Sequence, residues 1–368
     1  MPTEKNGSIF LTGITGGLGS WFAAEALEAG TRIVALVRAR NDDDARARVR
    51  ATLEIAGANG LSDRVEVICG DLCAPDASAD IEKQLPSHVS SIVHSAASTQ
   101  FRDLEDDFTF QANVEGTRRI LELAERRSLT LFHVSSAYVA GKRKGVVTED
   151  ETDAGQKFNN GYERTKFISE IEVRDWAQRA GLPVTILRPS IVMGDFRNGR
   201  TVKFNGIYDF LRVLDLVVPR YQGELVRLAT GDNVTKNIIT LDYFARAAWH
   251  IVHNDIRGCF HLTNPVPPTM RQLGEIFSRV FHFDTEDYRL VEPWEFVIRK
   301  PTPLEQIVLD AMMTYRHYVT LEPVFDRTHA VQALAGSGIE LPALDDVYFR
   351  RLVEYGHTVK WGKLHRKA

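Results

Sequence analysis

Tyr162 and Lys166 stand four residues apart, a spacing that would place both side chains on one face of a helix. A lysine ammonium beside a phenol stabilises the phenolate and lowers the pKa of the phenol toward neutrality. Ser135 and Ser136 lie upstream, at the end of an apolar stretch, where a hydroxyl could bind a substrate oxygen as charge develops on it. These residue types could therefore donate a proton and stabilise an oxyanion.

A glycine-rich turn opens the chain. Residues 9–19 form an apolar run that ends in Thr-Gly-x-x-Gly-x-x-Gly, and an amphipathic stretch follows over residues 20–29. Gly13 would allow a sharp turn, Gly16 would let a pyrophosphate approach the backbone, and Gly19 would let the helix pack close to the strand. The helix N-terminus would then face the phosphates. The order of strand, turn and helix predicts dinucleotide binding.

The residues after the next strands indicate which dinucleotide. Arg38 follows the second predicted strand, where a carboxylate would bind an adenosine ribose, and Arg48 lies close behind. Arginine can instead pair with a 2′-phosphate, so we predict NADPH as the cofactor, although a surface arginine would look the same. Asp71 is placed to accept a hydrogen bond from the adenine amine. Ala96 and Ala97 are small enough to let the cofactor lie against the backbone.

Apolar strands alternate with helical patterns through the first half of the chain. The predicted strands after the glycine turn cover residues 31–38, 65–71, 89–95, 129–135 and 184–189, and the main predicted helices cover residues 42–57, 103–127 and 160–180. Continuous apolar strands of this kind are typical of a parallel sheet covered on both faces. We therefore predict an α/β fold with a doubly wound, Rossmann-like parallel sheet.

The regular alternation decays after Gly194. Residues 195–206 are polar and predict a loop over the site. We predict an NADP-binding Rossmann domain over residues 1–194, with later strands from about residues 230–262, and a smaller, mainly helical substrate-binding domain over residues 195–368 that is interleaved with the sheet. Candidate walls of a substrate pocket, which could equally be core of the small domain, are Phe196, Phe204, Tyr208, Phe210 and Leu211.

Composition excludes several classes of function. The 368 residues include 45 basic and 49 acidic side chains, and a net charge of −4 gives no basic footprint for nucleic acid. Three cysteines without a histidine cluster predict neither a disulfide framework nor a metal site. No apolar run is long enough to cross a membrane, and the polar N-terminus does not resemble a signal peptide, so we expect a cytoplasmic protein.

Together these motifs resemble the extended, two-domain branch of the short-chain dehydrogenase/reductase superfamily over about residues 8–265. The motifs that fall in family order are Thr12-Gly13-x-x-Gly16-x-x-Gly19, Asp71-Leu72, Asn113-Val114-x-Gly116-Thr117, Ser136, Tyr162-x-x-x-Lys166 and Arg188-Pro189-Ser190-x-Val192-x-Gly194. The resemblance implies that Ser136, Tyr162 and Lys166 are catalytic, with Asn113 as a supporting fourth member that bonds backbone or a water feeding Lys166. We expect cofactor contacts from Thr12, Gly13, Thr15, Gly16, Gly17, Leu18, Gly19, Arg38, Arg48, Asp71, Leu72, Ala96, Ala97, Lys166, Pro189, Ser190 and Val192.

Within this branch the chain is most similar to the thioester reductase and fatty acyl reductase ("male sterility") group. The similarity lies in residues 36–40, 133–139 and 260–265. It implies reduction of an acyl thioester by NADPH to an aldehyde, with further reduction to an alcohol left open. Ser136 stands where many members have threonine, and the chain has no adenylation or carrier domain, so the substrate would be a CoA thioester or an acyl group on a separate acyl carrier protein.

Two other functions stay open from the sequence. The same scaffold supports a nucleotide-sugar epimerase or a hydroxy/keto dehydrogenase, although Arg38 replaces the carboxylate expected where NAD is held tightly. A non-catalytic cofactor sensor would not need Tyr162 and Lys166.

Overall fold

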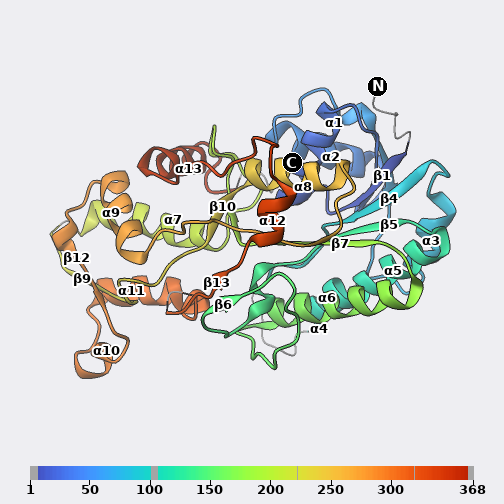
Figure 1. Ribbon diagram of the computed structural model, residues 1–368. Coiled ribbons are helices and arrows are strands. Elements are labelled where there is room, and N and C mark those ends of the chain that lie inside the picture. The colour runs from blue at the N-terminus through green and yellow to red at the C-terminus, as the bar shows by residue number, and fades with distance from the viewer. Residues whose placement is uncertain (1–6, 101–106, 222, 319, 364–368) are drawn as a thin grey trace.

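The computed structural model describes residues 7–100, 107–221, 223–318 and 320–363 (Figure 1). Seven parallel strands form its central sheet: β1 (Ser8–Thr12), β2 (Ile33–Val37), β3 (Val65–Cys69), β4 (Val89–His94), β5 (Thr130–Val134), β7 (Val184–Pro189) and β11 (Gly258–Leu262). Their order across the sheet is β11-β7-β5-β4-β1-β2-β3. The sheet is built outward in both directions from β1 and β4, so the predicted doubly wound parallel sheet is confirmed.

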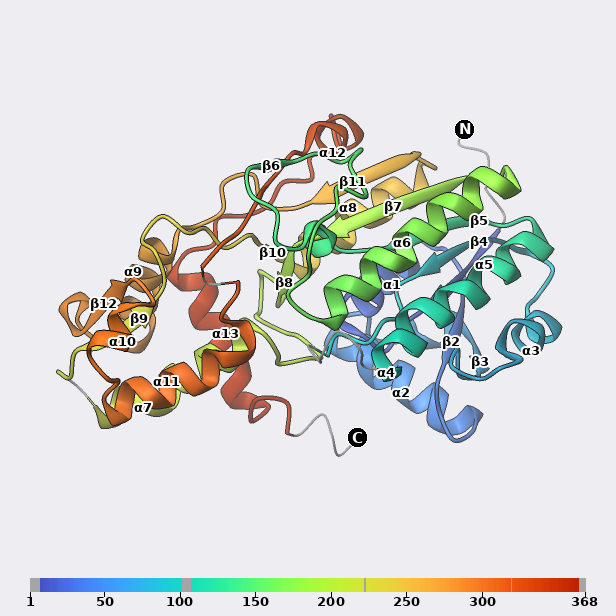
Figure 2. The same ribbon diagram turned by 90° about the horizontal axis from the view of Figure 1, so that it is seen from below.

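Helices cover both faces of the sheet (Figure 2). One face carries α1 (Gly17–Glu28), α2 (Asp42–Ile55) and α8 (Leu241–His253), and the other carries α3 (Ala77–Gln84), α5 (Gly116–Arg127) and α6 (Gly161–Ala180). Side chains alternate along β1, so Ile9 and Leu11 enter the first apolar layer and Phe10 enters the second. This burial on both faces explains why the strands are continuous apolar runs.

The helix expected over residues 103–127 is interrupted. Residues 103–106 lie outside the described part of the chain, α4 covers Asp107–Phe110, and a π-helical segment, η2 (Gln111–Glu115), precedes α5. The hydroxyl of Thr117, at the start of α5, donates to the carbonyl of Asn113 within this segment at 2.6 Å. Such side-chain bonds compete with the regular helical ladder, and π segments often mark functional positions.

A smaller lobe lies to one side of the sheet. Its elements are α7 (Ile207–Val217), η4 (Val218–Arg220), β9 (Val226–Ala229), α9 (Met270–Phe281), η5 (Thr285–Asp287), β12 (Tyr288–Val291), α10 (Glu295–Ile298), α11 (Pro303–Met312), η6 (Met313–Tyr315) and α13 (Asp346–Thr358). Strands β9 and β12 pair in parallel at its outer end (Figure 1). Tyr208, Phe277 and Phe349 from α7, α9 and α13 share one buried apolar cluster, which holds the lobe together.

Short pairings connect the two lobes. The remaining elements are η1 (Ser62–Arg64), η3 (Ala137–Ala140), β6 (Val146–Val147), β8 (Ile191–Met193), β10 (Ile238–Thr240), β13 (Val324–Phe325) and α12 (Thr328–Ala333). β8 pairs with β10, and β6 pairs with β13. The buried carboxylate of Glu149 accepts hydrogen bonds from the backbone N–H groups of His261, His329 and Ala330, which fastens β11 to the start of α12. In the described residues, no helix has the length and apolar character needed to cross a bilayer.

Candidate active site

The glycine turn between β1 and α1 is closely packed. Gly13 has a φ of +82°, and a Cβ built there would lie 2.7 Å from the backbone nitrogen of Ala96. A Cβ at Gly19 would lie 2.2 Å from the carbonyl oxygen of Gly13. Neither position has room for a side chain, so the turn and the helix come as close as the sequence pattern predicts. Thr15 and Leu18 lie in this same turn and first helical residues.

The N-terminus of α1 offers free backbone donors. Gly16, the residue before the helix, makes no side-chain cap, and Gly17 begins the helix. The first N–H groups of a helix have no partner inside the helix, and together with the dipole they attract phosphate. This end of α1 therefore fits the pyrophosphate of a dinucleotide.

Two arginines meet beside the ends of β2 and β3. The guanidinium of Arg48 donates to the carbonyl oxygen of Arg38, and the guanidinium of Arg38 lies 3.8 Å from the carboxylate of Asp71. Arg38 and Asp71 are both well exposed, so their ion pair is weak and easily rearranged. Leu72 is buried beneath them and packs against α5. The cluster places two cations beside the carboxyl ends of β2 and β3.

Ser190 supplies an unpaired polar atom on the other side of the sheet edge. Its Oγ is buried and has no hydrogen-bond partner among the described residues. Pro189 ends β7 just before it, and Val192 lies in β8 just after it. A buried hydroxyl without a partner is costly unless a ligand or water bonds it, so Ser190 fits a contact with the cofactor. Ala96 and Ala97 follow β4 and are partly exposed.

Ser136 and Tyr162 meet at the carboxyl edge of the sheet. Ser136 precedes η3, Tyr162 lies in the first turn of α6, and their side chains are joined by a hydrogen bond. Burial raises the pKa of Tyr162, and the hydrogen bond to Ser136 opposes this rise. The direction is opposite to the lowering expected from the sequence, because removal of the phenol from water outweighs the effects that favour phenolate.

Lys166 lies one turn further along α6 and is buried. Its Nζ donates to the carbonyl oxygen of Val134, the last residue of β5, at 2.7 Å. Burial lowers the pKa of Lys166 to about 8, and the carboxylate of Glu170 opposes that shift. The ammonium therefore stays mainly protonated at neutral pH while remaining close to its titration range.

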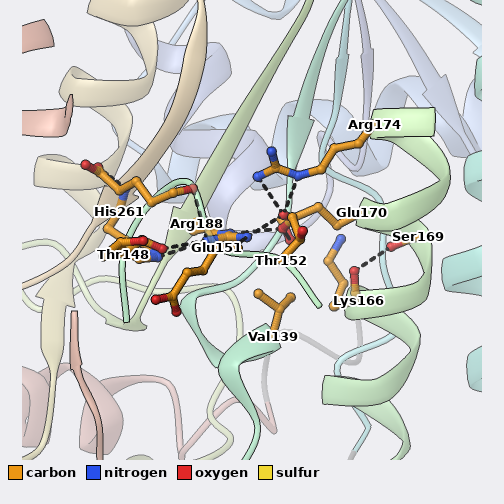
Figure 3. Close-up of polar contacts among 12 residues, drawn as sticks. Val139, Thr148, Glu151, Thr152, Lys166, Ser169, Glu170, Arg174, Arg188 and His261 are labelled. Carbon is orange, nitrogen blue, oxygen red and sulfur yellow. Dashed lines mark hydrogen bonds and ion pairs between the residues drawn. The ribbon is translucent and has the colours of Figure 1, made fainter. Parts of the chain in front are cut away.

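A buried ion pair lies behind Lys166 (Figure 3). Arg188 is 1% exposed and binds the carboxylate of Glu170 through two nitrogens, at 2.6 and 3.0 Å. Arg174 adds a third bond to this carboxylate at 3.0 Å, and the hydroxyl of Ser135 donates to it at 2.6 Å. The hydroxyl of Ser135 is bonded to Glu170, and the serine that forms a hydrogen bond with the phenol of Tyr162 is Ser136.

Asn113 connects α6 to the loop after β4. Its Oδ1 accepts from the backbone nitrogen of Ser98 at 2.7 Å, and its Nδ2 donates to Ser98 O and to the hydroxyl of Thr165, both at 3.0 Å. Thr165 directly precedes Lys166. The side chain of Asn113 therefore bonds backbone, one of the two partners expected for it, and acts on the helix that carries Lys166.

A buried hydrogen-bond chain runs from Ala96 through Thr12, His94 and Thr117 to Asn113. The hydroxyl of Thr117 gives its one proton to the carbonyl of Asn113, so it can only accept from Nε2 of His94, 3.1 Å away. Nδ1 of His94 must then accept from the hydroxyl of Thr12, at 2.7 Å, and this hydroxyl oxygen accepts from Ala96 N. The chain therefore requires a neutral His94 with its proton on Nε2.

The environment of His94 agrees with this assignment. Burial and the nearby charge of Lys166 lower the pKa of His94 to about 3. His133 on the neighbouring strand lies with its ring centroid 5.5 Å from that of His94, and burial likewise holds its pKa well below the usual value. Two neutral imidazoles thus lie beneath Lys166, and no pattern in the sequence indicated them.

A second network reaches the site from the C-terminal third of the chain. Tyr318 donates its hydroxyl proton to Glu163, the residue after Tyr162, and accepts from Asn160 at 2.8 Å. Separately, Tyr138 donates to Glu322 at 2.7 Å, and the ammonium of Lys236 lies 3.4 Å from the same carboxylate. Sequence reasoning missed these residues because they lie 86 to 184 positions from their partners and belong to no motif.

The candidate pocket walls have different environments. Phe196 stacks on Tyr348 with ring centroids 5.6 Å apart, and Phe204 packs against Tyr208 at 5.1 Å. These contacts place both phenylalanines in the apolar cluster of the small lobe, with Leu211. Phe210 lines an apolar pocket within the small lobe. In the described part of the chain, no group of three or more His, Cys, Asp or Glu side chains could hold a metal ion.

Comparison with known proteins identifies related domains. Residues 11–248 match the family model described as Male sterility protein. Glycine betaine reductase ATRR of Emericella nidulans is 29% identical over 292 residues, which cover 73% of this chain and 22% of the relative. The chain spans 8%, 22% and 24% of the length of three curated relatives that it matches, so it corresponds to a part of each.

Solved structures share the fold over nearly the whole chain. The crystal structure of the terminal R domain from the myxalamid PKS-NRPS biosynthetic pathway has a TM-score of 0.81 and 25% identity, covering 98% of this chain and 93% of that one. UDP-glucuronic acid 4-epimerase from Bacillus cereus, in complex with NAD, has a TM-score of 0.66 and 16% identity, covering 97% and 98%. At 16% identity, the similarity to the epimerase shows a shared fold alone.

Proposed function

Because the chain belongs to the male sterility protein family, an extended branch of the short-chain dehydrogenases/reductases that use a nicotinamide cofactor, we propose that it reduces acyl thioesters with NADPH. The observation that carries the proposal is the hydrogen bond between Ser136 and Tyr162, with the ammonium of Lys166 one helical turn away. This arrangement can receive the oxygen of a carbonyl, hold it and protonate it.

The residues present fit the cofactor. The glycine turn and the uncapped N-terminus of α1 would hold the pyrophosphate, and Ser190 offers a buried hydroxyl. Arg38 and Arg48 support NADPH, because their two guanidinium groups could pair with a 2′-phosphate. When bound, the reduced nicotinamide supplies a hydride.

The side chains complete the reaction. The thioester oxygen would accept hydrogen bonds from Ser136 and Tyr162, which stabilise its negative charge as the carbonyl carbon gains hydride. Tyr162 then transfers its proton to that oxygen, and Lys166 stabilises the phenolate left behind. The resulting hemithioacetal collapses by breaking its C–S bond, which releases an aldehyde and a free thiol. An aldehyde that rebinds could accept a second hydride and become an alcohol.

The substrate would be carried by CoA or by an acyl carrier protein. The terminal R domain of a PKS-NRPS pathway, which shares the fold over 93% of its length, supports the carrier-bound form. The fold is also that of a UDP-glucuronic acid 4-epimerase, so a nucleotide-sugar epimerase is the second candidate. Arg38 disfavours it, because tightly held NAD is usually bound by a carboxylate at this place.

Release of a free thiol distinguishes thioester reduction from nucleotide-sugar epimerisation. Purified protein with NADPH should release free thiol from acyl-CoA or acyl-carrier substrates in step with NADPH loss. Tyr162→Phe should abolish both signals, while Tyr355→Phe, which retains the ring in the small lobe, should leave them unchanged. Turnover of a ketone or a nucleotide sugar, without thiol release from short, long and aromatic acyl thioesters, would move the assignment to the second candidate.

A further inference from the structure

Glu163 is a buried carboxylate that directly follows the catalytic tyrosine. It lies in the first turn of α6, next to Tyr162, and is 0% exposed. Its Oε1 accepts a hydrogen bond from Nδ2 of Asn159 at 3.1 Å, and its Oε2 accepts from the backbone nitrogen of Asn159 at 2.8 Å. The hydroxyl of Tyr318, from the C-terminal third of the chain, also donates to Oε1. These bonds hold the carboxyl group in one position.

The hydrogen bonds of Glu163 fit an ionised carboxylate. All three partners donate a proton, and a carboxylate accepts such bonds without a proton of its own. The hydroxyl of Tyr318 accepts from Nδ2 of Asn160 at 2.8 Å and gives its own proton to Glu163. Burial raises the pKa of Glu163, whereas the bonds from Tyr318 and Asn159 lower it. We therefore expect a negative charge here at neutral pH.

The charge of Glu163 acts on the phenol of Tyr162. Consecutive residues of a helix point in different directions, so the two side chains do not face each other directly. Tyr318 is bonded to Glu163 and lies within electrostatic reach of the Tyr162 hydroxyl. Burial raises the pKa of Tyr162, the bond to Ser136 lowers it, and the charge of Glu163 raises it again. Among the described residues, Glu163 thus supplies the charge that acts on this phenol, while the ammonium of Lys166 is bonded to backbone.

Two further phenols and one cation face this carboxylate from other elements. Tyr138, in η3, packs edge-on against the ring of Tyr318 with centroids 5.4 Å apart. Burial raises the pKa of both phenols well above the usual value, so both stay neutral where Tyr162 titrates. Lys142, in the loop after η3, is exposed, and solvent screens its charge. Glu163 is therefore a fixed charge over the neutral and mildly alkaline range.

We propose that Glu163 holds the proton on Tyr162, so that the site is set to give a proton to a carbonyl oxygen and not to remove one from an alcohol. The inference rests on the proposed function for the role of Tyr162. After each reduction the Tyr162 phenolate takes a proton back from solvent, and repulsion by the neighbouring carboxylate favours this step. Tyr318 acts through Glu163 as a positioning residue.

The first experiment measures the phenol without catalysis. The ultraviolet phenolate signal of Tyr162 is the difference between each protein and the same protein with Tyr162→Phe, at a mildly alkaline pH where all are folded. Glu163→Gln should raise the phenolate fraction about threefold or more, equivalent to about half a pH unit, because the repelling charge is gone. Asp175→Asn should leave it unchanged, because Asp175 is exposed and lies about 18 Å further along α6. Equal phenolate fractions in wild type and Glu163→Gln would overturn the proposal.

Infrared spectroscopy tests the charge itself and does not depend on the folding of Glu163→Gln. The difference spectrum of wild type against Tyr318→Phe at neutral pH should show a shifted carboxylate band, because Glu163 loses one of its donors. A band of a protonated buried carboxyl group in the wild type would overturn the proposal.

The second experiment follows the reaction in both directions. Reduction needs the phenol and oxidation needs the phenolate. Glu163→Gln should therefore move the alkaline fall of kcat/KM for thioester and aldehyde reduction, and the alkaline rise for alcohol oxidation, toward lower pH by the same amount. Tyr318→Phe keeps the carboxylate and removes one of its donors, so it should lower kcat and leave both limbs in place.

The outcomes separate this inference from the proposed function. Equal shifts of the limbs in Tyr318→Phe and Glu163→Gln would show that packing acts instead of charge, and would refute the inference. Thioester reduction with the same limbs in wild type and Glu163→Gln would refute the inference and keep the proposed function. A raised phenolate fraction in a Glu163→Gln protein whose wild type reduces no thioester would refute the proposed function instead.

Discussion

Replacement of His94 by leucine should lower the free energy of unfolding by an amount that depends on pH. At pH 8 the replacement leaves the buried hydroxyl of Thr12 without the acceptor for its proton, which lowers the free energy of unfolding by roughly 1–3 kcal/mol. The folded protein holds the pKa of His94 at about 3, while the unfolded chain has it near 6.5. Lowering the pH from 8 to 5 therefore protonates His94 only in the unfolded chain, and this costs the wild type about 2 kcal/mol of stability.

Two measurements test this reasoning. Urea unfolding at pH 8 and pH 5 should show that the stability difference between wild type and His94→Leu shrinks by about 2 kcal/mol at the lower pH, because the variant has no group there to protonate. Nitrogen NMR of the wild type should place the His94 proton on Nε2 throughout this range. A difference that is independent of pH, or a protonated Nδ1 at pH 5, would refute the neutral tautomer that the Thr12–His94–Thr117 chain requires.

Three further variants test other parts of the molecule. Arg38→Asp should raise the KM for NADPH tenfold or more, about 1.4 kcal/mol of binding, and an unchanged preference for NADPH over NADH would exclude Arg38 as the determinant. Tyr162→Phe should reduce kcat at least about 100-fold while NADPH still binds, as fluorescence titration would show. Glu305→Gln should lower the urea concentration at the midpoint of unfolding, because the guanidinium of Arg227 loses the carboxylate that it pairs with. The hydrogen bond from Arg227 lowers the pKa of Glu305 to about 2, so denaturation curves should converge as the pH falls from 4.5 toward that value.

The sequence predicts the sheet because each strand is a short, continuous apolar run that can be recognised from its own residues. The run at residues 184–189 is β7 itself, and the second strand was expected over residues 31–38 where β2 covers Ile33–Val37. Burial on both faces makes such strands continuous apolar runs, and the capping residue Asn160 marks the start of α6. These signals lie within a few residues of the element that they predict.

The rest of the site depends on contacts that leave no local signal. β6 and β13 are two residues each, too short for any periodic pattern, and they pair across more than 170 positions. The π segment at Asn113 arises from bonds to Ser98 and Thr117 that only the folded chain brings into place. The pKa of Tyr162 was expected to fall because of Lys166, but burial, which spacing does not reveal, raises it.

The small lobe comes from three separate stretches of the chain, around α7 to β9, from α9 to η6, and at α13. Between them the chain returns to the sheet to form α8 and β11, and later β13 and α12. Recombination at one breakpoint therefore cannot exchange the whole small lobe between two relatives. A chimera with new substrate selectivity would need several coordinated junctions, and we expect such enzymes to diversify by point substitutions in the small lobe more readily than by exchange of a contiguous module.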